Sequence, residues 1–204
     1  MFAKIGRNTE ASTGTNPLRG NALGGVVVED GYQDKTQAGK HFFAFCGVQD
    51  VALYTATSAI GMIVYNPLGS GVNMIPKLWS VNVSITSASM TGMVMATSAQ
   101  LITPTSTTAA TLSGKSLITG STGLTGGSCI AYSVATIITA PVVVWPLFTN
   151  YAAVNTVGAL APLAGDFKGA FGFAPGTVCV IGAFAAAGVD VDIGLTWDEV
   201  PTGL

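Results

Sequence analysis

A long segment of this chain is almost free of charge. Between Val51 and Val189 lie 139 residues, and only four of them are charged: Lys77, Lys115, Asp166 and Lys168. In ordinary globular domains about a quarter of the residues are charged, and these charges keep the surface soluble and monomeric. A segment this poor in charge either crosses a membrane or has a neutral surface that other protein covers.

The membrane alternative is disfavoured by the residues themselves. Residues 130–148 are uncharged and long enough to span a bilayer as a helix. They contain Pro141 and Pro146 and are rich in Thr, Val and Ile, which favour strand over helix. No Lys or Arg closely flanks this stretch to set an orientation. We therefore expect no membrane partner.

Composition and charge narrow the class further. Gly, Ala, Thr, Ser and Val dominate while Glu and Lys are scarce, which is typical of strands and loops. The net charge is −2 and no basic stripe is present, so we expect no nucleic-acid partner. Three widely spaced cysteines, Cys46, Cys129 and Cys179, predict buried free thiols in a protein made in a reducing compartment.

The N-terminal region differs from the rest. Residues 1–50 hold ten of the 18 charged side chains, and residues 8–25 are a run of turn-forming residues with little hydrophobic periodicity. We predict an extended N-terminal arm over residues 1–40, with an unstructured terminus as the alternative. Residues 1–12 lack the apolar core of a signal peptide, so no secretion signal is expected.

Residues 41–204 have the pattern of one all-β domain. Short apolar or alternating segments are separated by Gly and Pro turns, and no long amphipathic helix is visible. The expected strands are His41–Val48, Val51–Thr57, Gly61–Tyr65, Leu78–Ile85, Met93–Thr97, Ser128–Thr139, Val142–Phe148, Thr177–Phe184 and Val191–Val200. Residues 104–127 form a loop region with room for a short strand at 117–119, and residues 167–173 lead into a turn. This pattern predicts an antiparallel β-sandwich or jelly roll.

Three short motifs carry a resemblance to a known family. The first is a loop of Asn66, Pro67, Gly69, Ser70 and Gly71 before a long strand. The second is the Pro175–Gly176 turn between two strands, and the third is a last strand that carries Trp197 and Glu199, followed by Pro201. Over residues 51–201 the chain resembles small jelly-roll virion proteins of tailed phages, of the capsid decoration or head-fibre type. The resemblance implies a homotrimer bound to the outside of a phage head.

No set of catalytic residues is visible. His41 is the only histidine and lies in an aromatic run, where a structural role is expected. Cys46, five residues on, falls on the opposite face of the strand by parity, which disfavours a Cys–His pair. The glycine-rich residues 120–128 lack the lysine of a phosphate loop, and Gly69 and Gly71 lack the third glycine of a dinucleotide fingerprint. We expect no enzyme and no cofactor.

Two sets of side chains near the ends of strands have open alternatives. Asp190, Asp192, Asp198 and Glu199 are expected to be solvated acids at a strand end. The alternatives for them are Ca²⁺ ligands or charge contacts with a partner. Trp79, Trp145 and Trp197 fall one to a strand and are expected in the core or at a trimer axis, with a sugar-stacking platform as the alternative.

The sequence thus predicts a non-enzymatic virion protein. Its partners would be further copies of itself, as a homotrimer, and the major capsid protein, on a capsid surface assembled in the host cytoplasm. The arm would grip the capsid or a neighbouring trimer through Phe2, Lys4, Arg7 and Arg19. The alternatives are a carbohydrate-binding adhesin and a tail or neck structural protein of the virion.

Overall fold

The structure is a computed structural model of the 204-residue chain. It describes residues 40–48, 50–86, 90–109, 127–151, 163–185 and 189–203, and three short strands at 19–20, 26–27 and 115–116. Phe2, Lys4 and Arg7 of the expected arm lie outside the described residues, as does the possible strand at 117–119. Arg19 is described only as backbone, in β1 (Arg19–Gly20), which pairs with β2 (Val26–Val27).

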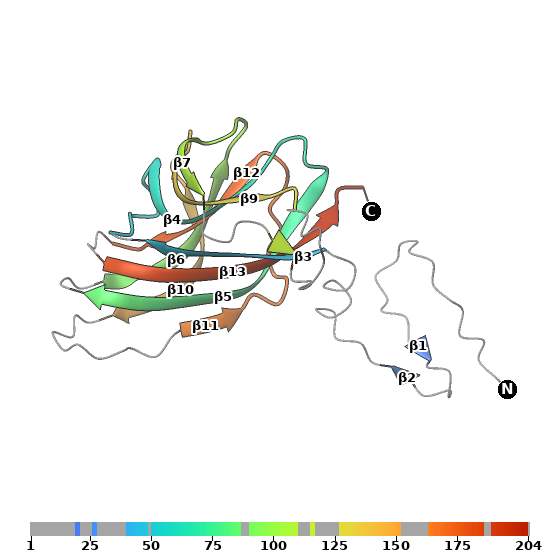
Figure 1. Ribbon diagram of the computed structural model, residues 1–204, viewed down its shortest axis with the longest axis horizontal. Helices are drawn as coiled ribbons and strands as arrows, with labels where there is room; N and C mark the ends of the chain where they lie inside the picture. Colours follow the sequence, from blue (N-terminus) through green and yellow to red (C-terminus); the bar gives the residue numbers. More distant parts are fainter. Residues whose placement is uncertain are drawn as a thin grey trace.

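The described domain consists of two antiparallel sheets packed face to face, with no helix in the described residues (Figure 1). The six-stranded sheet has the order β10 (Val142–Tyr151), β6 (Met90–Ala99), β12 (Thr177–Ala183), β4 (Ser58–Asn66), β9 (Ile130–Thr136), β7 (Thr105–Ala109). The five-stranded sheet has the order β11 (Leu163–Asp166), β5 (Val72–Thr86), β13 (Val189–Pro201), β3 (His41–Val48), β8 (Lys115–Ser116).

The strand order is that of a jelly roll. Through β3, β4, β5 and β6, and again through β10 to β13, consecutive strands lie in opposite sheets. The last two strands close the fold, because β12 lies between β4 and β6 while β13 lies between β3 and β5. Strands β7 and β9 extend the six-stranded sheet beyond β4, as an insertion between β6 and β10. The predicted all-β sandwich is confirmed.

Alternation of side chains along β13 builds the core between the sheets. Val191, Ile193, Leu195 and Trp197 are buried, while the side chains that alternate with them at positions 192, 194 and 196 are only partly covered. Trp197 is fully buried and stacks on Phe42 of β3, with ring centroids 6.2 Å apart. The three cysteines are buried and free, as the sequence predicts.

A second apolar cluster lies on the other face of the six-stranded sheet. Ile63 and Tyr65 alternate along β4 with Met62 and Val64, which belong to the main core. The remaining members of this cluster are Ala59, Tyr132, Ala135, Ile137, Val178 and Val180. Strand β12 is therefore covered on both faces, which explains its unbroken apolar sequence.

One expected strand is wrong. In the segment 51–57 only Leu53 forms a bridge, with Ala183, and a turn follows it. The backbone N–H of Val51 bonds to Val189 and that of Ala52 bonds to Ile60, so successive residues pair with different elements. The apolar sequence of this segment therefore reflects packing of Val51 into the core rather than a ladder.

Candidate functional site

Asn66 of the expected motif loop joins two other segments of the chain by hydrogen bonds inside the domain. It is the last residue of β4, is fully buried, and its Nδ2 donates to the carbonyl oxygens of Val72 (2.8 Å) and Phe173 (2.9 Å). Within the loop the N–H of Ser70 donates to the carbonyl of Pro67. Gly71 has φ 68°, a value that glycine adopts at little cost. The motif therefore shapes a tight connection between the two sheets.

The second motif lies against the first. Gly176 has φ 79°, as the third position of a type II turn after proline requires. Its N–H donates to the carbonyl of Asn66 at 2.8 Å, so the Pro175–Gly176 turn and the 66–71 loop are adjacent. The end of the third motif also lies next to the first, since Pro201 pairs with Val72 and the N–H of Thr202 donates to the carbonyl of Gly71 at 2.9 Å. Trp197 and Glu199 of this motif are buried in the interior.

Buried Gln100 ties further loops to this end of the sandwich. Its backbone N–H donates to the carbonyl of Gly176 (2.8 Å) and its Nε2 donates to the carbonyl of Ile102 (2.7 Å). Its Oε1 accepts the N–H of Ile138 (2.9 Å). One residue thus fixes the connection after β6 and the connection after β9 through its side chain, and the turn before β12 through its backbone.

These loops present a set of exposed aliphatic side chains, which we call the loop platform. Its members are Leu68 (59% exposed), Leu101 (59%), Ile102 (57%) and Ile138 (49%). A Cβ atom at Gly176 would lie 3.0 Å from Leu68 Cδ1 and 3.4 Å from Leu101 Cδ2, so both leucines pack over this glycine. The platform is a set of exposed aliphatic side chains on loops that hydrogen bonds join to one another.

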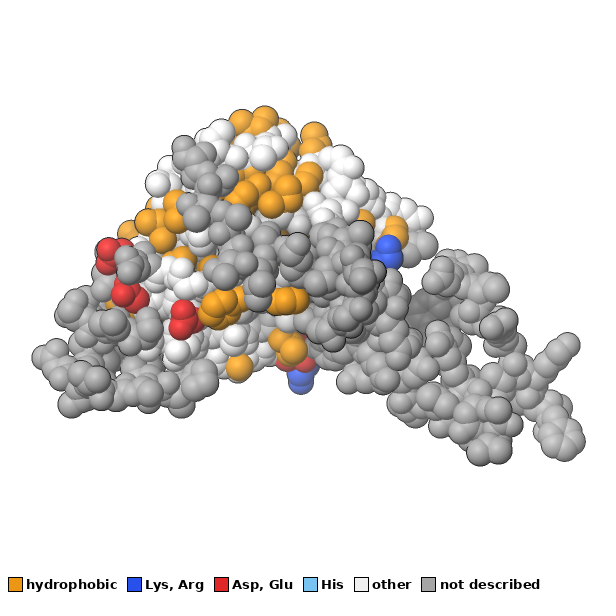
Figure 2. Space-filling model, viewed as in Figure 1, with side chains coloured by type: hydrophobic (Ala, Val, Ile, Leu, Met, Phe, Trp, Pro, Cys, Tyr) orange, Lys and Arg blue, Asp and Glu red, His pale blue; other side chains and the backbone are white. Residues whose placement is uncertain are grey.

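The platform loops carry no charge. Residues 66–71, 100–104, 137–141 and 174–176 contain no Asp, Glu, Lys, Arg or His, and each of these segments contains one proline. In Figure 2, hydrophobic side chains likewise gather at the upper end of the molecule, and the coloured charged groups lie lower. Neutral, apolar and proline-stiffened loops are suited to contact with another protein surface.

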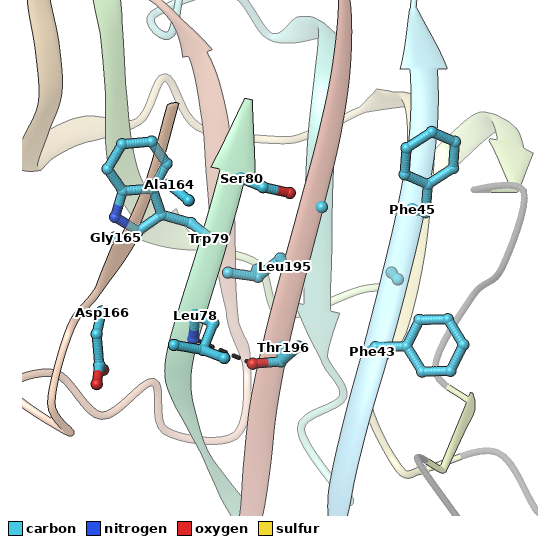
Figure 3. Close-up of a pocket in the computed structure, with 12 residues that line it drawn as sticks. Phe43, Phe45, Leu78, Trp79, Ser80, Ala164, Gly165, Asp166, Leu195 and Thr196 are labelled. Atoms are coloured by element: carbon cyan, nitrogen blue, oxygen red, sulfur yellow. Dashed lines mark hydrogen bonds between the residues drawn. The ribbon is translucent and has the colours of Figure 1, made fainter. Parts of the chain in front are cut away.

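A groove of about 640 Å³ lies on the outer face of the five-stranded sheet (Figure 3). Phe43 and Phe45 of β3 line one side and Leu78 of β5 lines the other, while small residues such as Ser80 and Gly194 form the floor. One polar group of the groove is already hydrogen-bonded within the domain, since Thr196 Oγ1 accepts the N–H of Leu78 at 3.0 Å. We call this feature the outer-face groove.

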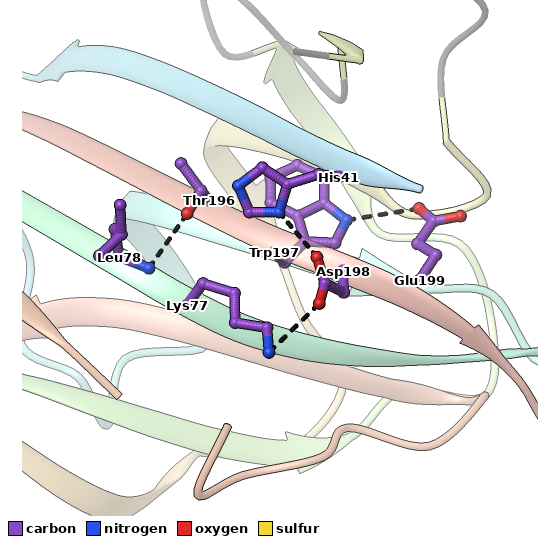
Figure 4. A network of polar contacts seen from close by, with 7 residues as sticks. All are labelled: His41, Lys77, Leu78, Thr196, Trp197, Asp198 and Glu199. Atoms are coloured by element: carbon purple, nitrogen blue, oxygen red, sulfur yellow. Dashed lines mark hydrogen bonds and ion pairs between the residues drawn. The ribbon is translucent and has the colours of Figure 1, made fainter. Parts of the chain in front are cut away.

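Next to the groove, three charged or titratable side chains join three strands (Figure 4). Asp198 of β13 accepts from His41 Nδ1 of β3 at 2.7 Å and pairs with Lys77 Nζ of β5 at 3.2 Å. Asp198 is only 3% exposed, so the expectation that it is solvated is wrong. Its carboxylate is buried because two cationic or N–H partners replace water. The expected structural role of His41 agrees with this network.

Glu199 is also buried rather than solvated, at 4% exposed. Its Oε2 accepts the N–H of Ser128 (2.7 Å), and its Oε1 accepts the N–H of Cys129 (2.9 Å) and Nε1 of Trp197 (3.3 Å). The carboxylate therefore fastens the segment before β9 to the core tryptophan. The sequence could not show this, because Ser128 and Cys129 are about 70 residues away.

The other two acids keep contact with water. Asp190 Oδ1 accepts the N–H of Asp50 at 3.2 Å, and Asp192 Oδ2 lies 3.5 Å from Asn82 Nδ2. Both are half-buried. Within the described ranges, no three His, Cys, Asp or Glu side chains are grouped so that they could hold a metal ion.

The cysteines are not placed for nucleophilic chemistry. Burial, and secondarily the charge of Asp192, raises the pKa of Cys46 to about 12. Burial likewise raises the pKa values of Cys129 and Cys179, and Glu199 adds to the effect at Cys129. Cys46 faces the core, where its Sγ contacts the carbonyl of Gly61, while His41 faces outward to Asp198. The predicted separation of His41 from Cys46 is confirmed.

The three tryptophans have different environments. Trp197 is in the core, as expected, and Trp79 is half-buried with its ring over Gly165. Trp145 on edge strand β10 is 47% exposed. Its ring packs edge-to-face on that of Phe171, with ring centroids 5.5 Å apart. The three do not form one stacking surface, since they lie on different strands and differ in burial.

Among the side chains of the platform and the groove, only Trp79 is a sequence-predicted candidate. A usable signal exists for the platform: Leu101, Ile102 and Ile138 are aliphatic residues within a few positions of Pro104 or Pro141, where turns are usually polar. For the groove the signal is the alternation of Phe43 and Phe45 with small buried residues in β3.

Comparison with protein-family models, with curated proteins and with solved structures finds no match for this chain. No helix in the described part of the chain is long and apolar enough to cross a membrane.

Proposed function

We propose that this chain is a non-enzymatic structural protein of a virus particle, a homotrimer that decorates the outside of a tailed-phage capsid and stabilises it. One observation carries the proposal: a jelly roll whose surface exposes large apolar side chains where charges would be expected. The motif resemblance of residues 66–71, 175–176 and 197–201 to phage decoration proteins supports the same role.

Several large apolar side chains are exposed on this surface. Val142, Leu68, Leu101 and Ile102 are each more than half exposed. Interfaces in permanent assemblies are depleted in charge at their centre and resemble a domain core cut in two. A protein bound across the joints between capsomers stabilises the assembled shell because it binds that state and not the dissociated one.

The test uses purified particles of the virus that encodes the chain, prepared with and without the protein. We expect immunogold labelling on the head, and particles without the protein should break at lower temperature or at low salt. Deletion of residues 1–40, which include Phe2, Lys4, Arg7 and Arg19, should abolish particle binding while the oligomer remains. Label on the tail or neck would contradict the capsid role and favour the tail alternative.

The outer-face groove supports a second candidate, a carbohydrate-binding adhesin of the virion. Phe43 and Phe45 offer ring faces on which a sugar can stack, and Ser80 and Thr196 offer hydroxyl groups nearby. Particles lacking the protein would then keep their heat and salt stability but lose adsorption to the host. The Phe45→Ala variant would show the same loss of adsorption.

A further inference from the structure

We propose that the loop platform is a self-contact, at which copies of this chain meet around a rotation axis. The inference rests on the proposed function in one respect, that the chain is a homo-oligomer, and it names the surface that makes the oligomer. The occupant of the platform is therefore Leu68, Leu101, Ile102 and Ile138 of further copies.

The absence of charge in the platform loops indicates that this surface contacts further copies of the same chain. Side chains that lie close to a rotation axis approach the same side chains of the other copies, so a charge there would face its own sign. Contact with a different protein has no such restriction and commonly uses complementary charges for orientation and rate. All four platform loops lack charge, whereas the outer-face groove has Asp166 on its rim. The platform therefore fits self-contact better than the groove does.

The rigidity of the platform favours association. Gln100 holds the connections at Ile102 and Ile138 by two side-chain hydrogen bonds, and Gly176 is bonded to both Gln100 and Asn66. Pro67, Pro104, Pro141 and Pro175 restrict the backbone of all four loops. Surfaces that are already ordered lose less conformational entropy on binding, so a small apolar contact can still be specific.

The experiment exploits the symmetry of a self-contact. Leu101→Glu and Leu101→Lys are purified separately, and the mass of each is followed against concentration by light scattering and native mass spectrometry. Each alone should raise the dissociation constant of the oligomer at least about tenfold, because identical charges meet at the axis. An equal mixture of the two should form oligomers that contain both chains, because Glu–Lys contacts replace part of the like-charge contacts.

Matched controls come from the groove. Leu78 is also an exposed leucine, and it lies on β5 in the other sheet. Leu78→Glu and Leu78→Lys should leave the oligomer intact, and circular dichroism should show that all four variants are folded. The platform assignment is overturned if the Leu101 variants remain oligomeric, if their mixture gives no mixed oligomer, or if only the Leu78 variants dissociate.

Failure of the self-contact and failure of the proposed function give different results. A wild-type chain that is monomeric at every concentration, yet binds virus particles and stabilises them, would refute the self-contact and the homotrimer but not the capsid role. A wild-type oligomer that Leu101→Glu dissociates, but that is absent from particles, would refute the capsid role alone. Insertion of the platform into a lipid surface would appear as binding of the wild-type chain to neutral phosphatidylcholine vesicles, and that binding would also overturn the self-contact.

Discussion

Glu199→Gln tests whether the buried carboxylate is a structural fastener. The wild-type side chain accepts three hydrogen bonds, at 2.7 Å from Ser128 N–H, 2.9 Å from Cys129 N–H and 3.3 Å from Trp197 Nε1. Glutamine has nearly the same shape but only one acceptor oxygen, and its NH₂ group must face at least one of these donors. The variant therefore loses the charge and leaves at least one N–H group without its acceptor.

The expected fall in the free energy of unfolding follows from the number of hydrogen bonds that the variant loses. Hydrogen bonds to a charged group contribute about 1.5–3 kcal/mol, and an unsatisfied buried donor costs about 1–3 kcal/mol. Because glutamine keeps part of the network, we expect the free energy of unfolding to fall by roughly 2–4 kcal/mol. For a domain of this size the midpoint of thermal unfolding should then fall by about 5–15 °C.

The measurement is urea unfolding at neutral pH, followed by circular dichroism and by tryptophan fluorescence. Asp192→Asn is the matched control on the same strand. Asp192 is half-buried, and its hydrogen bond with the Asn82 side chain is long, at 3.5 Å. That control should change the free energy of unfolding by less than about 0.5 kcal/mol. A Glu199→Gln protein as stable as wild type, with the same denaturant slope, would refute the fastener role.

Two further predictions concern other buried groups. Gln100→Leu keeps the volume but removes both side-chain bonds, so it should destabilise the domain by roughly 1–3 kcal/mol and speed amide exchange at Ile138; unchanged exchange would contradict its role. Burial raises the pKa of Cys46 from its ordinary 9.0 to about 12, so its thiol should resist iodoacetamide at pH 8 until urea unfolds the chain. Because the unfolded thiol ionises first, stability is retained below pH 9 and falls above it, by about 1.4 kcal/mol per pH unit, and Cys46→Val should remove this part of the slope.

The sequence predicted the fold class well because alternation and turn residues carry that information locally. It predicted β13 closely, where apolar and polar residues alternate. It placed the start of β5 too late, at Leu78 instead of Val72, because Pro76 reads as a strand breaker. In the structure Pro76 lies beyond the residues that pair with β11, and it is opposite Trp197 of β13 beside a register shift, where the ladder is irregular.

The candidate surfaces were less predictable, because they depend on contacts between distant segments. Nothing local marks Gln100 as a link between the loops at Ile102, Ile138 and Gly176. The same holds for Asp198, whose local sequence suggests a solvated acid and whose partners come from β3 and β5. Local patterns identify the strands, while long-range pairing decides which polar groups are buried.

Two of the four acids near the end of the chain, Asp198 and Glu199, act inside the domain rather than on its surface. Asp198 and Lys77 link three strands, and Glu199 holds the segment before β9. Charges used in this way stabilise the fold but cannot keep exposed aliphatic residues such as Leu101 and Val142 apart from other copies. The low charge noted in the sequence is therefore lower still at the surface. Such a domain gains more from covering its apolar loops by assembly than a protein with an ordinary charged surface would.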